Sequence, residues 1–204
     1  MTNVADGEAA FLAKDYEKAR VLWTAPADAG DSEAEAWLGS LYANGLGVER
    51  DATIAFAHYL RAAKGGNILA ANNVAVMYVK GEGVTADLEQ AAFWFHDAAK
   101  KGDLFAQYNY AVALTKGLGV TINLEAAIGW YRRAAEAGHY PSQARLGSCY
   151  AKGVGTPVDR IEAFAWLSSA SRHGVDQANA ELKELLPHMS ETEKRLASAS
   201  INRR

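Results

Sequence analysis

Residues 117–138 read GLGVTINLEAAIGWYRRAAEAG, and this stretch decides the fold because related stretches recur at a spacing of 36 residues. The related stretches begin at Gly45, Gly81 and Gly153, and each opens with a Gly-x-Gly pair. Each also ends on a further glycine, 21 residues after the first, as Gly138 does here. No insertion separates the copies, so the chain is a tandem repeat.

Each copy predicts two short helices joined by a loop. The first helix ends at the Gly pair, where a glycine can adopt the left-handed conformation that closes a helix. A residue that can cap the next helix then follows in every copy: Asp51, Asp87, Asn123 and Asp159. Gln90 and Glu162 stand three residues after their caps, in the capping-box position. The second helix carries apolar residues at helical spacing, for example Ala127, Trp130, Tyr131, Ala134 and Ala135.

Such short helices are not stable alone, but stacked copies can bury each other's apolar stripes. The sequence therefore predicts an all-α fold, a right-handed α/α superhelix (solenoid) of about four 36-residue helix-turn-helix repeats plus helical end caps. We expect the first helices on its concave side. We also expect the large aromatic residues Trp94 and Trp130 to lie between successive repeats, where they fill the gaps left by the alanines.

The whole chain, residues 1–204, is interpreted as a single repeat domain. Its parts are a degenerate N-terminal helix pair (1–33), four repeats (34–69, 70–105, 106–141 and 142–177) and C-terminal capping helices (178–204). In the N-terminal part a tight turn at Lys14 to Tyr16 replaces the Gly-pair loop. In the C-terminal part Ser190 and Glu193 predict a capping box for the last helix.

The repeat follows the pattern A-x-x-x-L-G-x-x-Y-x-x-G-x-G-V-x-x-D-x-x-x-A-x-x-W-Y-x-x-A-A-x-x-G, which resembles the Sel-one-like repeat (SLR), a relative of the tetratricopeptide repeat. The third copy matches its second half closely, from Gly117 to Gly138. The resemblance covers residues 34–177. It implies a scaffold of the kind found in protein quality control, bacterial signalling, exopolysaccharide regulation or host-cell contact.

Composition and charge exclude several classes of protein. Of the 204 residues, 50% are hydrophobic and 22% charged, so the chain is folded rather than disordered. A net charge of −3 gives no general attraction to nucleic acid. No stretch has the roughly 20 apolar residues of a membrane span. Asp6 and Glu8 do not suit a signal peptide, so we expect a cytoplasmic protein, or a periplasmic or secreted one if a signal was removed before residue 1.

Signals for catalysis are poor. The Gly pair follows a helix and never extends to a nucleotide-binding fingerprint. The single cysteine, Cys149, has no base that can be named as its partner, and it fits a small packing residue better. The five histidines show no spacing typical of a zinc site; they are His58, His96, His139, His173 and His188. We therefore predict no enzyme activity, no cofactor and no catalytic or metal-binding residues.

Polar and aromatic positions of the first helices are the candidates for binding. Asn and Gln both donate and accept hydrogen bonds, so a row of them can pair with the backbone of an extended peptide. Trp and Tyr supply large contact areas. The alternative is that these positions are merely a polar surface. The candidate residues are Trp37, Asn72, Asn73, Gln107, Tyr108, Asn109, Gln143 and Arg145.

We therefore expect a non-catalytic protein–protein interaction module, an adaptor or regulator that binds a protein or peptide on its concave face. One alternative is an enzyme or a binder of cell-wall ligands, as proposed for secreted, cysteine-rich members of the family; this chain lacks their cysteine pairs. Another is a self-associating structural protein. The sequence does not identify the partner or the oligomeric state.

Overall fold

The computed structural model describes residues 4–201, with the side chains of residues 198, 200 and 201 left aside, and all regular structure in that range is helical. The chain divides into two compact units, Met1–Asp103 and Leu104–Arg204. The all-α helical-repeat solenoid predicted from the sequence is thereby confirmed as the fold class. The right-handed superhelix stays a prediction, and each unit is described by itself.

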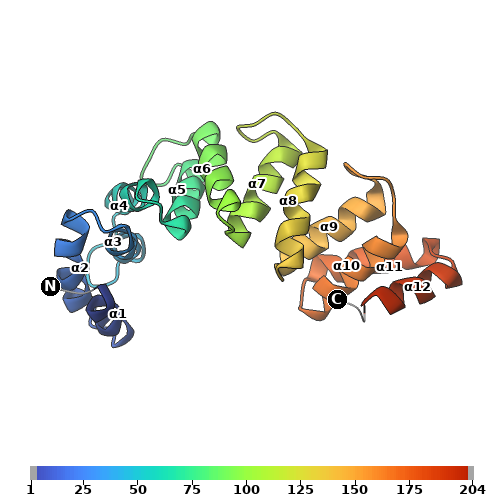
Figure 1. Cartoon of the computed structure of the whole chain (residues 1–204), viewed down its shortest axis with the longest axis horizontal. Helices are drawn as coiled ribbons and strands as arrows, with labels where there is room; N and C mark the ends of the chain where they lie inside the picture. The colour runs from blue at the N-terminus through green and yellow to red at the C-terminus, as the bar shows by residue number, and fades with distance from the viewer. Residues whose placement is uncertain (1–3, 202–204) are drawn as a thin grey trace. The chain divides into compact units, whose positions relative to one another are not determined.

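In its described residues, 4–103, the first unit contains six helices, labelled α1 to α6 in Figure 1. Helices α1 and α2 form the N-terminal pair, α3 and α4 the first repeat, and α5 and α6 the second. Their bounds are Val4–Leu12, Tyr16–Asp28, Ser32–Asn44, Ala52–Lys64, Ile68–Lys80 and Leu88–Lys100. Within the N-terminal pair, Trp23 is completely buried and its indole Nε1–H donates a hydrogen bond to the carbonyl oxygen of Val4, at 3.1 Å.

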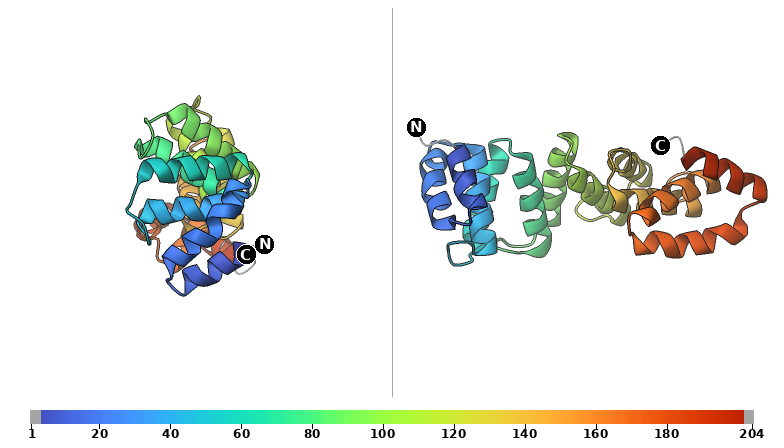
Figure 2. Two further views of the ribbon diagram at one scale, coloured as in Figure 1. Left: turned by 90° about the vertical axis from the view of Figure 1, so that its left-hand side faces the viewer. Right: turned by 90° about the horizontal axis from the view of Figure 1, so that it is seen from below.

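The second unit contains the third and fourth repeats and the C-terminal helices. In Figure 2 the last helix, α12, lies beside α10, which it contacts. The α-helices α7 to α12 span Leu104–Lys116, Leu124–Glu136, Tyr140–Lys152, Arg160–Arg172, Asp176–Leu185 and Glu191–Ile201, and a 3-10 turn at Leu186–His188 precedes α12. The predicted capping box is confirmed, because Ser190 Oγ accepts from the Glu193 N–H and Glu193 Oε2 from the Ser190 N–H.

The predicted caps of the second helices are also confirmed. The side chains of Asp51, Asp87, Asn123 and Asp159 each accept a hydrogen bond from a first-turn backbone N–H. The Glu162 side chain makes a further hydrogen bond within the same helix: its Oε2 accepts from the Trp166 indole N–H at 3.0 Å. Among the large aromatics, Trp94 is buried, whereas Trp130 is only half-buried.

The Gly-pair loop of the second repeat holds that repeat against the first. Gly83 has φ +71°, and a Cβ added to it would lie 2.0 Å from the carbonyl oxygen of Ala52, the first residue of α4. Only a residue without a side chain allows so close an approach of loop and helix. The second glycine of the pair is therefore needed for packing between repeats as well as for its backbone conformation.

Candidate functional site

A hollow of about 220 Å³ opens between the first helices of the first two repeats, α3 and α5. We call it the N-terminal hollow. Tyr59 of α4 also lines it, and the cavity brings together two of the predicted binding residues, Trp37 and Asn73. The full lining is Glu33, Ala36, Trp37, Ser40, Tyr59, Asn67, Leu69, Ala70 and Asn73.

The walls of the N-terminal hollow combine a fixed aromatic residue with an exposed aliphatic one. The Trp37 ring stacks on Trp23, with centroids 5.0 Å apart and planes at 8°, so the core of the N-terminal helix pair holds it in place. Leu69 is 67% exposed. Asn67 caps α5 by accepting from the Ala70 N–H at 2.9 Å, so its side-chain oxygen is already engaged. The Asn73 amide is the remaining carboxamide in the lining.

A similar hollow of about 170 Å³ lies between α7 and α9 in the second unit. We call it the C-terminal hollow. Tyr131 and Arg145 stand in its lining 72 residues after Tyr59 and Asn73, which is two repeat lengths. The full lining is Val112, Thr115, Lys116, Tyr131, Arg145, Ser148, Cys149 and Val154. The same position of the repeat thus contributes an amide to one hollow and a cation to the other.

The electrostatics of the two hollows follow from burial. Burial raises the pKa of Tyr59, partly opposed by its hydrogen bond with Ser40. Burial also raises the pKa of Tyr131 to about 12, against a hydrogen bond with Thr115. Both phenols therefore stay neutral at physiological pH. A hydrogen bond with Tyr108 raises the pKa of Arg145, which stays a cation.

The second unit also holds Cys149, which the sequence predicts to be a packing residue rather than a nucleophile. Burial raises the pKa of this thiol, so it is protonated at neutral pH, and the thiolate is the form that acts as a nucleophile. A packing role therefore suits Cys149 better than catalysis.

The remaining predicted binding residues are placed as follows. Tyr108 pairs with Arg145 and also contacts the rings of Tyr131 and His139, with centroids 5.9 and 5.4 Å away. Asn72 and Asn109 are half-buried. Gln107 and Gln143 are buried, each 7% exposed, and so do not lie on an open polar surface. Whether the eight residues share one groove stays a prediction, because they belong to two units.

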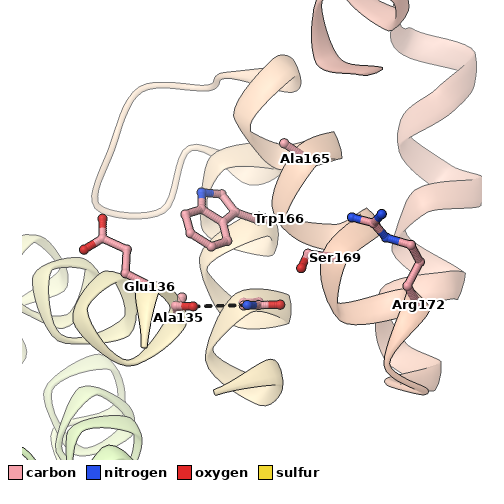
Figure 3. Close-up of a pocket in the computed structure, with 7 residues that line it drawn as sticks. Ala135, Glu136, Ala165, Trp166, Ser169 and Arg172 are labelled. Carbon is pink, nitrogen blue, oxygen red and sulfur yellow. Dashed lines mark hydrogen bonds between the residues drawn. The ribbon is translucent and has the colours of Figure 1, made fainter. Parts of the chain in front are cut away.

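Gln143 instead lines a third cavity, of about 380 Å³, which lies between the second helices α8 and α10 (Figure 3). We call it the socket. Its residues are Ala135, Glu136, Gln143, Ala165, Trp166, Ser169 and Arg172. Of these residues, only Gln143 was among those predicted from the sequence to bind a partner. A comparison of residues at the 36-residue period could have drawn attention to Ser169, because Arg61 and Arg133 stand at the equivalent position of the first and third repeats.

In the first repeat, the residues equivalent to Gln143, Trp166 and Ser169 form a cluster of ionisable groups around the buried carboxylate of Glu35. His58 Nδ1 is 2.6 Å from Glu35 Oε2, and Arg61 Nε donates to Glu35 Oε1 at 2.5 Å. The His58 ring stacks on Tyr42, with centroids 5.7 Å apart. The Glu35 carboxylate, only 6% exposed, is thus satisfied by a histidine and an arginine. Buried charges need such partners, and the cluster is explained as an internal structural network.

Two further findings concern the part of the chain between residues 4 and 201. There, no three side chains of His, Cys, Asp or Glu come together as ligands of a metal ion would. The helices in this range are also too short or too polar for any of them to pass through a lipid bilayer.

Comparisons with known proteins agree with this architecture. The family model of the Sel1 repeat matches residues 32–67, 68–103, 104–139 and 141–175. A Sel1 repeat protein from Oxalobacter formigenes has a similar structure, with a TM-score of 0.84 and 32% sequence identity over 89% of this chain and 75% of that one. A protective antigen of uropathogenic Escherichia coli with an SLR fold gives a TM-score of 0.83 and 28% identity, over 92% of this chain and 40% of the antigen. No curated protein sequence matches the chain.

Proposed function

Because the chain belongs to the Sel1 repeat family, whose members generally mediate protein–protein interactions, we propose that it is a non-catalytic binding module that acts as an adaptor or regulator. In this proposal an extended segment of a partner protein lies over the first helices. The N-terminal hollow and the C-terminal hollow are each proposed to receive a side chain of such a segment.

The recurrence of the hollow in both units carries this proposal. Each hollow has a neutral tyrosine and, at the same position of the repeat, a polar side chain: Asn73 in one and Arg145 in the other. The burial of both phenols is a repeated packing feature, whereas the residue beside them differs between the hollows. A scaffold that repeats the buried tyrosine and varies the residues around it is suited to binding different side chains.

The chemistry of the linings favours particular ligand groups. In the N-terminal hollow, Trp37 and Leu69 suit an apolar side chain, and the Asn73 amide can both donate to and accept from a peptide group. In the C-terminal hollow, Arg145 suits a carboxylate, with which it can form a bidentate pair. We therefore propose that the N-terminal hollow takes an apolar partner residue and the C-terminal hollow an acidic one.

A peptide library displayed on phage and selected on the immobilised full chain tests this proposal. For an enriched peptide, Asn73→Ala is expected to raise the dissociation constant at least about fivefold, since a buried peptide group then loses its hydrogen bond. Fluorescence anisotropy with the labelled peptide gives this constant. Gln90→Ala, which removes an exposed amide from α6 in the same unit, is the matched control and should leave binding unchanged.

Two results would contradict the proposal. One is a selection that enriches no peptide. The other is an enriched peptide that depends on neither hollow. Such a peptide would bind the folded Asn73→Ala variant as tightly as the parent chain, and high salt, which weakens an ion pair with Arg145, would not displace it. Circular dichroism of each variant is the control that its helical structure is intact.

A further inference from the structure

The socket of the fourth repeat contains a buried acceptor that the chain leaves without a partner. Gln143 is 7% exposed, and its Nε2 donates to the carbonyl oxygen of Ala135 at 3.1 Å. Its Oε1 is buried as well and accepts no hydrogen bond within the described part of the chain. A buried acceptor without a donor is costly, and native proteins supply one from water or a ligand. The Gln143 oxygen therefore points to a donor that enters the socket.

The first repeat shows what a donor at this place looks like. Glu35 and Gln143 are 108 residues apart, three repeat lengths, and occupy the same position of their repeats. Arg61 Nε donates to Glu35 Oε1 there, and the residue equivalent to Arg61 in the fourth repeat is Ser169. The first repeat thus supplies its own guanidinium to the acceptor on its first helix, whereas the fourth repeat has a short hydroxyl side chain instead.

The third repeat gives a second example of an arginine at this position. Arg133, 36 residues before Ser169, lies over the ring of Trp130, with Cζ 4.7 Å from the ring centroid. Trp130 is the counterpart of Trp166, which lines the socket. Two of the four repeats therefore have an arginine at the position of Ser169, which in the fourth repeat lines a cavity of about 380 Å³. That volume is within the range of about 300–1,000 Å³ typical of small-ligand sites.

We propose that the socket binds an arginine side chain of a partner protein, with the guanidinium donating to Gln143 Oε1 and lying against the Trp166 ring. This inference deepens the proposed function and rests on it in one respect, namely that the arginine belongs to a protein partner. Arginine is favoured over lysine because its planar group has several donors in fixed directions and can stack on an aromatic ring.

The charged groups around the socket agree with this orientation. Figure 3 shows Glu136 and Arg172 on opposite sides of the socket, with Trp166 between them. Neither residue takes part in an ion pair within the described residues. A second carboxylate, that of Glu162, is bonded to the Trp166 indole. In this proposal the guanidinium lies on the Glu136 side of the socket, because that carboxylate attracts it. Arg172 can then pair with an acidic group next to the arginine in the partner.

N-Acetyl-arginine amide is the probe for this proposal, titrated into the full 15N-labelled chain. The chemical shift of the Trp166 indole N–H, assigned by its loss in Trp166→Phe, reports occupancy of the socket and gives the dissociation constant. The corresponding citrulline amide, which is nearly isosteric but uncharged, should bind at least about fivefold more weakly. Equal binding of the citrulline and arginine amides, or no shift of the Trp166 signal with either, would overturn the proposal.

Two substitutions and a control sharpen the test. Ser169→Arg gives the fourth repeat the arginine of the first and third, so it should fill the socket from within and weaken probe binding more than about tenfold. Glu136→Gln removes the exposed counter-charge and should weaken it about threefold to fivefold, as for an exposed ion pair. Glu125→Gln, on the same helix but outside the socket, should have no effect. Unchanged binding in both socket variants would also overturn the proposal.

The two proposals fail separately. Asn73→Ala tests the N-terminal hollow alone, because N-acetyl-arginine amide is expected to bind the socket whether or not Asn73 is present. If the amide binds in the socket and Asn73→Ala has no effect on selected peptides, the arginine site stands and the proposed role of the first helices falls. If peptides depend on Asn73 but the amide gives no signal, the arginine site falls alone.

Discussion

The close approach of Gly83 to α4 allows a test of how neighbouring repeats are held together. An added Cβ at Gly83 would lie 2.0 Å from the Ala52 oxygen, 2.4 Å from the Ala52 carbonyl carbon and 2.9 Å from the Thr53 nitrogen. All three are backbone atoms at the start of a helix, so no side-chain rotation relieves the overlap. Gly66 is the matched control, because it also has a positive φ (+96°) but an added Cβ there would meet nothing within 4 Å.

The two substitutions to alanine separate backbone strain from steric overlap. Gly66→Ala should cost about 1 kcal/mol, the strain of a left-handed L-residue. Gly83→Ala carries the same strain and adds an overpacking cost of about 2–3 kcal/mol. For a chain of this size about 1 kcal/mol lowers the melting temperature by roughly 3 °C, so decreases near 3 °C and 10 °C are expected.

Circular dichroism at 222 nm and calorimetry measure these melting temperatures. Both are needed because an array of repeats can unfold in more than one step. Calorimetry of Gly83→Ala should show that the transition of the first unit is displaced or separated. Equal decreases for the two variants would refute the argument, since they would leave backbone conformation as the sole reason for a glycine at residue 83.

Two further predictions concern the aromatic residues. Trp23→Ala should cost about 3–5 kcal/mol, because Trp23 is completely buried, whereas Trp130→Ala should cost roughly half as much, since Trp130 is half-buried; urea unfolding of both variants checks the order. The pKa of about 12 for Tyr131 lies above its ordinary value of 10, so the unfolded chain loses this proton first and stability should fall as the pH rises from about 10 to 12. Tyr131→Phe should make that fall less steep, and melting curves at three alkaline pH values measure it.

The parts of the fold that depend on neighbouring residues in the chain could be predicted from the sequence. The cap at Asp51 and the Ser190–Glu193 box need only a side chain and the N–H groups two or three residues away. The left-handed glycines are equally local, and Gly117 has φ +71°. The repeat period then fixed which segments pack as neighbours, so the order of the helices followed as well.

The candidate sites were harder to predict because they depend on how helices turn toward one another. Gln143 and Arg145 are two residues apart on the same helix and were assigned to the same binding row. The structure buries Gln143 against the end of α8 and leaves Arg145 in the C-terminal hollow. Residues two positions apart on an α-helix differ by about 200° around its axis, so they face nearly opposite sides. Side-chain type alone does not reveal which side is covered.

Departures from the repeat are the informative positions of this protein. A residue found in every copy, such as the glycines of the loop, is explained by packing that every copy shares. Ser169 departs from the arginine of two other copies, and the structure has a cavity and a buried acceptor beside it. Glu35 departs from the glutamine of the third and fourth copies, and there His58 and Arg61 supply its partners. The departure at Glu35 is compensated inside the chain, and the departure at Ser169 is not. Recognition of a partner is therefore best sought where a repeat loses a side chain that its neighbours use to satisfy one another.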